Sequence, residues 1–392
     1  MRALIVGAGI VGCAVARELA MHGVAVEILD RSAPGAATTA HCEGNILVSD
    51  KNPGPELALQ QLSRRLWPEV LDSIRDECGA DATDPVEWDP KGGIVVATTT
   101  DGADQLTKFV AGQAAAGVTS HAMTADEAHA AEPFLTRDFT AAYHYPDDAQ
   151  VQPVAAAFAL LRAALRLGVR LHPGVTVTGP VVQSSALRGV TTTAGAFAAD
   201  VVINCAGPWA ATVSASLGAP ISVKPRRGNL LVTTPQPPTV FHKVYDADYV
   251  GAVGSSDAGL QTSTVVEATK GGPLLIGSSR ERVPLTTGIT MASLEQMARK
   301  AIRLFPHLAG IQVMRAYGGF RPYVDDHLPV IGADSRLPGL WHATGHEGGG
   351  IGLSVGTATL LRAQLLEHPL PMECSHFRVD RPAIVDREGV NS

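Results

Sequence analysis

Three glycines near the start of the chain have the type and spacing of a phosphate-binding turn. Gly7, Gly9 and Gly12 form a G-x-G-x-x-G pattern that follows the apolar run 3–6 and leads into a helical stretch at 13–22. The first glycine permits a tight turn, the second lets the backbone approach a pyrophosphate, and the third brings helix and strand close together. The free N–H groups and positive dipole end of the helix attract phosphate. The pattern therefore predicts a dinucleotide site.

The residues around these glycines support the same interpretation. The run at 3–6 is typical of a strand buried on both faces of a parallel sheet, and Gly23 ends the helix before a second strand at 24–29. Asp30 follows that strand, where a carboxylate accepts hydrogen bonds from adenosine ribose hydroxyls and repels a 2′-phosphate. Glycines that only pack a tight strand–helix unit are the alternative. Beyond the glycines, the predicted nucleotide contacts are Ile10, Val11, Asp30 and Arg31.

The fingerprint alone does not separate NAD from FAD, but the next segment favours FAD. Residues 35–47 are mostly small or hydroxyl-bearing, where a nicotinamide dehydrogenase more often continues with a regular strand and helix. We expect Thr38 and Thr39 to hydrogen-bond the pyrophosphate, and the backbone near Gly44 to approach a ring system. An ordinary surface loop is the alternative. The predicted cofactor contacts here are Thr38, Thr39, His41, Gly44 and Asn45.

A second glycine-rich turn lies near the C-terminus. The stretch GHEGGGIGLSVG at 345–356 follows a predicted strand at 340–343 and leads into a predicted helix at 353–366. A helix N-terminus there stabilises the negative charge that builds at the N1–C2=O edge of a reduced flavin, and NAD needs no such second site. The two turns together predict FAD. The further predicted contacts, which include the ends of strands expected at 175–177 and 201–204, are Val175, Ala206, Gly207, Gly348, Gly349, Gly350, Ile351 and Gly352.

Composition and charge describe a soluble globular chain that acts on small molecules. The 392 residues are 45% hydrophobic and 18% charged, enough for a large core and two interleaved domains. A formal net charge of -7 without a long basic run gives no reason to expect nucleic acid. Five scattered cysteines with no C-x-x-C pair predict free thiols in a reducing, cytoplasmic compartment. The uncharged stretch at 3–16 is too short for a transmembrane segment.

The segments between the nucleotide-binding parts have a different pattern. DPVEWDPKGGIVVATT and PISVKPRRGNLLVTTP alternate polar and apolar residues, as antiparallel strands of a half-exposed sheet do. The predicted fold class is α/β, with a Rossmann-type FAD-binding domain and an interleaved substrate domain of the α+β kind, based on an antiparallel β-sheet. The predicted boundaries are 1–80, 146–215 and 320–375 for the FAD-binding domain, 81–145 and 216–319 for the substrate domain, and 376–392 for a C-terminal tail.

Four motifs together resemble the D-amino acid oxidase superfamily of FAD-dependent oxidoreductases. They are the N-terminal fingerprint, the Ala206-Gly207 pair, GGFRPYVDDHLPVIG and GHEGGGIGLSVG, and the resemblance covers nearly the whole chain. HCEGNILVSDKNPGPELAL and KPRRGNLLVT are most similar to the group of glycine oxidase, opine oxidase and D-hydroxyproline dehydrogenase subunits. The resemblance implies FAD-dependent oxidation of a small amino or imino acid, such as a D-amino acid, a proline derivative or glycine.

The resemblance also implies how substrate binds and reacts. Gly319 and Arg321 belong to the segment that faces the flavin, and the guanidinium of Arg321 is expected to grip the substrate carboxylate, for which it has a planar, bidentate match. The α-carbon of the neutral amine then gives a hydride to flavin N5, leaving an imine that water hydrolyses. An internal ion pair between Arg321 and Asp325 or Asp326 is the alternative to the carboxylate contact.

Three further residues are candidates for the catalytic set. His346 and Glu347 either line the flavin, tune the amine's protonation, or serve structure, and the same alternatives hold for His41 and Glu43. Tyr249, with Tyr245, lies in a glycine-flanked segment that suits a lid or an exposed surface. We expect no metal site, because His342 and His346 cannot share a helical face. The G-x-S-x-G at 352–356 lacks the strand that a hydrolase serine requires.

The resemblance leaves a second function open. In this alternative, the chain is the flavin-carrying subunit of a hetero-oligomeric opine or amino acid dehydrogenase and passes electrons to a partner. No cysteine cluster in the sequence is able to hold an iron–sulfur centre itself. Such partner subunits would also place the chain at a membrane surface rather than free in the cytoplasm.

Overall fold

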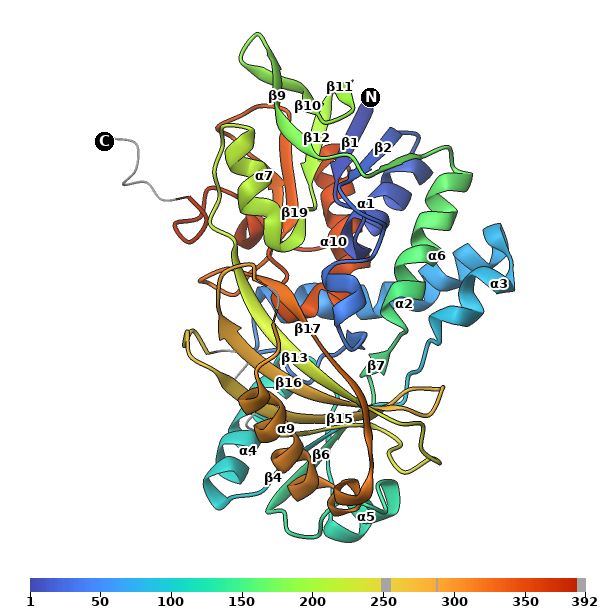
Figure 1. Cartoon of the computed structure of the whole chain (residues 1–392), viewed down its shortest axis with the longest axis vertical. Helices are drawn as coiled ribbons and strands as arrows, with labels where there is room; N and C mark the ends of the chain where they lie inside the picture. The colour runs from blue at the N-terminus through green and yellow to red at the C-terminus, as the bar shows by residue number, and fades with distance from the viewer. Residues whose placement is uncertain (248–254, 287, 386–392) are drawn as a thin grey trace.

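The computed structural model of the chain describes residues 1–247, 255–286 and 288–385. Most of its strands belong to two large sheets, which occupy the upper and lower halves of the molecule in Figure 1. The first sheet has six strands in the order β18-β19-β12-β1-β2-β8. Five of them run parallel, and β18 is antiparallel at the edge. Their bounds are β1 Arg2–Val6, β2 Ala25–Asp30, β8 Arg170–Pro173, β12 Val201–Asn204, β18 Val330–Ala333 and β19 Leu340–Thr344.

Helices cover the first sheet and form the larger core with it. Ile5 of β1, Leu19 of α1 and Leu361 of α10 are fully buried in one apolar cluster that also includes Ala164 of α6. Apolar runs on both the strands and the helices drive this burial, as expected for a parallel sheet. The helices are α1 Ile10–Met21, α2 Pro55–Cys78, α6 Pro153–Arg166 and α10 Gly350–Leu365, with the shorter α3 Ala80–Thr83 and α7 Ala210–Ser216.

The second sheet has eight strands in the order β17-β13-β16-β15-β14-β4-β6-β5. All its neighbours pair antiparallel except β14 and β4. The helix α9 packs on β15 and β16 through buried residues such as Met297. The bounds are β4 Gly93–Ala97, β5 His121–Ala122, β6 Ala141–Tyr145, β13 Lys224–Thr233, β14 Lys243–Asp246, β15 Gln261–Ala268, β16 Leu274–Arg282, β17 Val313–Tyr323, α4 Thr100–Ala115, α5 Ala125–Ala131 and α9 Met291–Leu304.

Two small sheets complete the strands. One is the hairpin-linked set of β9 Val177–Gln183, β10 Ala186–Thr192 and β11 Gly195–Ala198, which lies at the top of Figure 1. The other pairs β3 Asn45–Ile46 with β7 Ala149–Gln150. Short 3-10 helices that matter below are η1 Thr38–His41, η3 Gly207–Trp209 and η5 Glu347–Gly349.

The predicted fold class is confirmed, and the differences lie at element boundaries. Helix α1 begins at Ile10, three residues before the predicted start, because the first intrahelical hydrogen bond runs from Cys13 N–H to Gly9 O at 2.9 Å. Helix α10 likewise begins within the glycines, at Gly350. The strand predicted at 175–177 is wrong in position, because β9 starts only at Val177. The backbone N–H of Val175 donates instead to the carbonyl oxygen of Asp30, the last residue of β2, at 2.9 Å.

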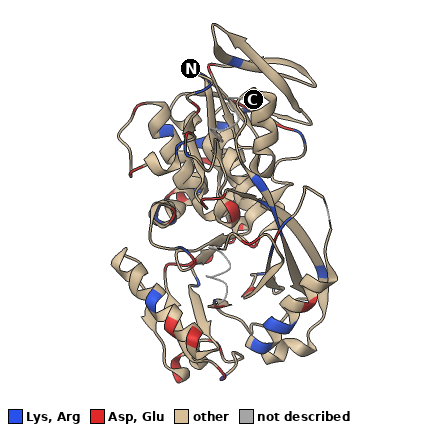
Figure 2. Cartoon of the chain, turned by 90° about the vertical axis from the view of Figure 1, so that its left-hand side faces the viewer, with Lys and Arg blue, Asp and Glu red and all other residues tan. Residues whose placement is uncertain are grey.

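Three further observations concern the charged residues, the helices and the cysteines. In the part of the chain that the structure describes, both basic and acidic residues occur on elements of both halves (Figure 2). No helix in those ranges has the length and apolar character that crossing a bilayer requires. All five cysteines fall within them and are free thiols.

Candidate functional site

A pocket lies between the two sheets. From the first sheet it receives the carboxyl ends of β1, β2, β12 and β19, which is where open α/β sheets bind their ligands. The opposite wall comes from β13, β16 and β17 of the second sheet. Lining residues include Val6, Asp30, Ala206 and Thr344 on the first side, and Gly228, Leu230, Arg280, Phe320 and Arg321 on the second.

The three fingerprint glycines serve different physical needs. Gly7 has a φ of +112°, and a Cβ there would lie 2.5 Å from Cys205 O. A Cβ on Gly12 would overlap the carbonyl of Gly7, so Gly12 brings α1 against the end of β1. At Gly9 a Cβ would meet only Thr39 Oγ1, at 3.4 Å. Gly9 lines the pocket, so it is the position where an added methyl group would fill ligand space rather than protein space.

Hydrogen bonds fix the turn and the segment after it. Asp30 Oδ2 accepts from Ala8 N at 2.7 Å, and Thr39 Oγ1 accepts from Ile10 N. Thr38 Oγ1 donates to Phe320 O at 2.7 Å and thereby ties η1 to β17. Both threonine hydroxyls thus have protein partners at the pocket wall, whereas sequence reasoning assigned them to a pyrophosphate. That assignment stays a prediction.

Two helix N-termini open into the pocket. The first residues of α1, Ile10 and Val11, line it, as do Gly350 and Ile351 of α10. The N-cap residues Gly9 and Gly349 have no side chain to cap their helices, and in α1, among the described residues, only the N–H of Ile10 is taken up by a side chain, that of Thr39. Uncapped first-turn N–H groups and the helix dipoles favour negative charge at both places. This arrangement fits a ligand that carries a pyrophosphate at one point and an electron-accepting ring at another.

Most of the predicted site residues meet in this one pocket. It brings together segments from both ends of the chain and from its middle. The predicted residues that line it are Gly7, Gly9, Ile10, Val11, Asp30, Arg31, Thr38, Thr39, His41, Gly44, Asn45, Val175, Ala206, Gly207, Gly319, Arg321, His346, Glu347, Gly348, Gly350 and Ile351.

Gly12, Gly349 and Gly352 do not line the pocket, and packing explains each. Gly12 faces Gly7, and Gly349 faces Leu353 Cδ1, at 3.1 Å from an ideal Cβ. At Gly352 a Cβ would lie 2.6 Å from Gln60 Oε1 of α2. The later glycines of the C-terminal run therefore let α10 approach α2 closely.

The two predicted lid tyrosines have different outcomes. Tyr249 lies outside the residues that the structure describes. Tyr245 belongs neither to a lid nor to the surface: it is fully buried in β14, where its hydroxyl donates to Ser49 Oγ.

Arg321 projects from β17 into the pocket wall. Its NH1 donates to Ser279 O at 2.8 Å, and a Cβ on Gly228 would overlap the guanidinium. The alternative of an ion pair with the following aspartates is wrong: Asp325 pairs with Lys224 at 2.6 Å and Asp326 with Arg381 at 2.9 Å. The missing side chain at Gly228 therefore makes room for a guanidinium at the pocket.

Glu347 is an ionised carboxylate that contacts a buried arginine and a histidine. Its Oε1 lies 2.6 Å from NH1 of the buried Arg226, and its Oε2 lies 3.2 Å from His327 Nδ1. Burial opposes the charge of the carboxylate. The hydrogen bond from His327 and the charges of Arg226 and Arg280 outweigh it and lower the pKa of Glu347 to about 2. Glu347 thus contributes a fixed negative charge at neutral pH.

His346 is a neutral, buried side chain. Its Nε2 lies 2.9 Å from Thr357 Oγ1 of α10, and burial lowers the pKa of His346 to about 3. This geometry suits an uncharged hydrogen-bonded residue that holds η5 against α10 beside the pocket. It does not suit a group that takes up a proton at neutral pH.

Sequence reasoning missed several pocket residues. Arg280 lines the pocket from β16, and Trp209 stacks under the guanidinium of Arg31, with Arg31 Cζ 3.9 Å from the ring centroid. Arg226, which holds Glu347, lies on the neighbouring strand β13. The only sequence signal for these arginines is a charge within a strand-like apolar pattern, in KPRRGNLLVT and IGSSRE.

With this geometry in place, comparison with known proteins decides the family. Residues 2–364 match the family described as FAD dependent oxidoreductase. The chain belongs to this family. FAD is accordingly its cofactor, and the two uncapped helix ends, together with the open space at Gly9 and at Gly207, fit that group.

Individual relatives agree over nearly the whole chain. The chain is 32% identical to the bifunctional protein ThiO/ThiG of Trichormus variabilis over 96% of its own length, and it spans about half, 54%, of that relative. It is 30% identical to a glycine oxidase of Geobacillus kaustophilus, covering 93% of this chain and 92% of that protein. The crystal structure of glycine oxidase from Geobacillus kaustophilus superposes with a TM-score of 0.86 at 26% identity, covering 97% of this chain and 99% of that one.

Proposed function

We propose that this FAD-dependent oxidoreductase oxidises a small amino or imino acid at the carbon bonded to nitrogen. The observation that carries the proposal is the guanidinium of Arg321 in the wall of the FAD pocket, held by Ser279 O in the space that Gly228 leaves. A guanidinium offers a bidentate match to a carboxylate and stays charged at any working pH. The names of the relatives, glycine oxidase among them, support an amino acid as the carboxylate-bearing substrate.

In the proposed reaction the chain's own residues bind and orient. FAD, when bound, supplies the acceptor for the hydride that leaves the substrate's α-carbon. Arg321 fixes the carboxylate, which fixes the direction of the C–H bond, and such positioning is worth several orders of magnitude in rate. The imine product is then hydrolysed by water to an oxo acid and ammonia or, where the substrate nitrogen carries a substituent, to an oxo acid and the corresponding amine. His346 and Glu347 keep constant charge near neutral pH and shape the pocket.

Anaerobic flavin reduction tests the proposal. The purified protein loaded with FAD is mixed without oxygen with glycine, sarcosine, D- and L-alanine, D- and L-proline, hydroxyproline and opines. At least one is expected to bleach the flavin absorbance, and the rate of its recovery on admission of air shows whether oxygen accepts the electrons. Recovery only with an artificial acceptor would favour a dehydrogenase or an electron-transferring subunit. A flavin that no amine reduces would contradict the proposal.

Replacing Arg321 tests its proposed role in binding the substrate carboxylate. Arg321→Lys retains one positive charge but loses the second donor, so we expect the KM of the reducing amino acid to rise about 10- to 100-fold. The flavin content should not change. Arg227→Lys is the matched control, because Arg227 lies on adjacent strand β13, pairs with Glu281 at 2.5 Å and does not line the pocket. An unchanged KM in Arg321→Lys would contradict the assignment.

A further inference from the structure

A second arginine, Arg280, lines the pocket together with Arg321. Arg280 lies on β16 and Arg321 on β17, so both belong to the pocket wall that the second sheet forms. The other residues of β13, β16 and β17 that line the pocket are uncharged: Gly228, Leu230, Gly319, Phe320 and Pro322. In the part of the chain that the structure describes, this wall therefore presents two positive charges and no negative one.

The strand order brings the two arginines close together. Strand β13 lies between β17 and β16. NH1 of Arg321 donates to Ser279 O of β16 at 2.8 Å, and an ideal Cβ on Gly228 of β13 would overlap the same guanidinium. The side chain of Arg321 thus crosses β13 at a glycine and ends at the residue that directly precedes Arg280.

The charge of Arg280 also reaches a carboxylate of the pocket. Burial disfavours the ionised form of Glu347, but the hydrogen bond from His327 and the charges of Arg226 and Arg280 lower its pKa to about 2. Of the two arginines, Arg226 forms the ion pair, with NH1 2.6 Å from Oε1. Glu347 thus has a cationic partner behind the wall, and Arg280 adds a further positive charge to this part of the pocket.

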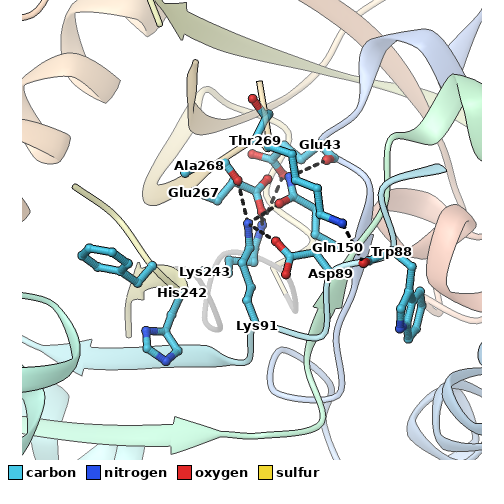
Figure 3. Close-up of polar contacts among 12 residues, drawn as sticks. Glu43, Trp88, Asp89, Lys91, Gln150, His242, Lys243, Glu267, Ala268 and Thr269 are labelled. Carbon is cyan, nitrogen blue, oxygen red and sulfur yellow. Dashed lines mark hydrogen bonds and ion pairs between the residues drawn. The ribbon is translucent and has the colours of Figure 1, made fainter. Parts of the chain in front are cut away.

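Glu43, another acidic residue that lines the pocket, is held by a cation from the far side of the sheet (Figure 3). Its Oε2 accepts a hydrogen bond from Asn45 Nδ2 at 2.8 Å and lies 3.9 Å from Nζ of Lys243, a buried residue of β14. Figure 3 shows Glu43 and Lys243 within one group of charged side chains that also includes Glu267. The carboxylates of Glu43 and Glu347 are therefore engaged by cations other than the two arginines of the wall.

Two guanidinium groups on one wall complement two anionic groups of a ligand. Each guanidinium is a planar fork of N–H donors that matches a carboxylate in a bidentate manner. Like charges placed near each other are unfavourable, and a bound anion at each relieves their repulsion. If both arginines held the same carboxylate, a second anionic group on the ligand would gain nothing. The number of carboxylates that the pocket prefers thus distinguishes the two arrangements.

We propose that the substrate is an amino acid with two carboxylates, and that Arg280 selects it by binding the second one. The inference rests on the proposed function, in which Arg321 binds the carboxylate next to the reacting carbon. The second carboxylate is carried either by the nitrogen, as in iminodiacetate, or by the side chain, as in aspartate. Amino acids with a single carboxylate bind more weakly, because they offer no anion to Arg280.

Amine-free analogues measure this preference without turnover. Oxydiacetate has the carboxylate spacing of iminodiacetate and succinate that of aspartate, and neither contains a nitrogen at which it could be oxidised. Each is compared with its own monoamide, which has the same shape but one carboxylate fewer. The four ligands are titrated into the FAD-loaded protein, and their Kd values are read from the change in flavin absorbance.

The native chain is expected to bind at least one of the two dicarboxylates at least about tenfold more tightly than its monoamide. A preference for oxydiacetate places the second carboxylate on the substrate's nitrogen, and a preference for succinate places it on the side chain. Equal Kd values within both pairs would overturn the proposal.

Replacing Arg280 assigns the preference to this residue. Arg280→Gln should reduce it to about twofold or less, while the Kd of the monoamide and the flavin content stay within about twofold of the native values. Arg282→Gln is the matched control and should keep the preference. Arg282 lies on the same strand, donates to Ser256 O at 2.8 Å and does not line the pocket.

A conservative variant covers the case in which Arg280→Gln does not fold. Arg280→Lys keeps the charge but loses the planar fork, so the Kd of the preferred dicarboxylate should still rise at least about threefold. An unchanged Kd of that dicarboxylate in a folded Arg280 variant would overturn the proposal. Because the analogues contain no amine, this result is readable even if no amino acid reduces the flavin. Equal binding within both pairs, beside flavin reduction by glycine or alanine, would overturn this inference and leave the proposed function standing.

Discussion

A single side chain, Glu347, shows how the pocket holds charge without a proton switch. It adopts a φ of +45°, in the left-handed region that non-glycine residues rarely occupy, and its carboxylate meets Arg226 and His327. Conformations of this kind persist only when surrounding contacts hold them. Here the ion pair with a fully buried arginine is the contact that does so. Because the neighbouring His346 is neutral, the ion pair of Glu347 and Arg226 supplies the charges in this part of the pocket.

Replacing Glu347 is expected to change the pH dependence of stability. Its pKa is lowered from 4.5 to about 2, so its contribution is fully present above pH 4.5 and is lost as the pH falls toward 2. Glu347→Gln should lower the free energy of unfolding by about 3 kcal/mol at pH 7, and by less at pH 3. Urea unfolding at the two pH values measures this. A difference between the native chain and the variant that does not narrow at pH 3 would contradict it.

At the residue scale, sequence reasoning reached those positions whose role is local. Gly7, Gly12 and Asp30 are recognisable because turn, helix and strand follow one another within a few residues, and the backbone geometry at each depends on near neighbours. The carboxylate-binding role of Arg321 was implied by the resemblance to the D-amino acid oxidase superfamily and not by a local pattern. The close packing of Glu43 on Gly277 joins residues far apart in the chain, and it depends on how β16 packs on the segment that carries Glu43, which no local pattern specifies.

At the scale of elements, the two glycine-rich turns are less alike than their sequences suggest. The first is a tight turn in which Gly7 and Gly12 are required by backbone contacts. The second is largely the start of α10 itself, and Gly352 and Gly356 bring that helix against Gln60 and Ser63 of α2. Close helix–helix packing and close approach of a cofactor both favour glycine, so the sequence alone does not show which of the two requires a given glycine. This is why the sequence placed the start of α10 too late and Gly352 in the cofactor site.

Alanine substitutions in the first turn should separate cofactor binding from folding. In Gly9→Ala the methyl group meets only Thr39 Oγ1 at 3.4 Å, so we expect the melting temperature of the cofactor-free protein to change by less than about 2 °C. FAD affinity should fall at least about tenfold. In Gly12→Ala the methyl group overlaps the Gly7 carbonyl, which should cost about 1–3 kcal/mol of stability. Equal effects of both variants on melting of the cofactor-free protein would contradict these roles.

At the scale of the whole molecule, each large sheet is built from strands of several separate chain segments. Strands of the first sheet come from residues 2–30, 170–204 and 330–344, and those of the second from 93–145 and 224–323. The predicted alternation between two sheets agrees with this order, because a change from continuous apolar runs to alternating ones is visible in the sequence. The strand order within each sheet was not predicted, since it depends on contacts between distant segments. The domain boundaries themselves stay a prediction.

Hydrogen exchange tests whether one cofactor occupies both helix ends. The first residues of α1 and α10, Ile10 and Gly350, line the pocket from positions some 340 residues apart in the chain. A bound dinucleotide should slow amide exchange at both, because it removes water and suppresses local opening. We expect FAD to slow exchange at residues 9–13 and 348–353 by at least about tenfold, and ADP, which is only its nucleotide half, to slow the first segment alone.

The contrast between the two ligands makes this outcome specific. General stabilisation would slow exchange everywhere, so the β10–β11 hairpin, which does not line the pocket, serves as the internal control and should be unaffected by either ligand. Protection of 348–353 by ADP as strongly as by FAD would mean that the signal spreads through the first sheet instead of coming from the ring end of the cofactor. Protection of 9–13 alone by FAD would remove α10 from the cofactor site, because a helix end in contact with the ring cannot exchange as freely as one facing water.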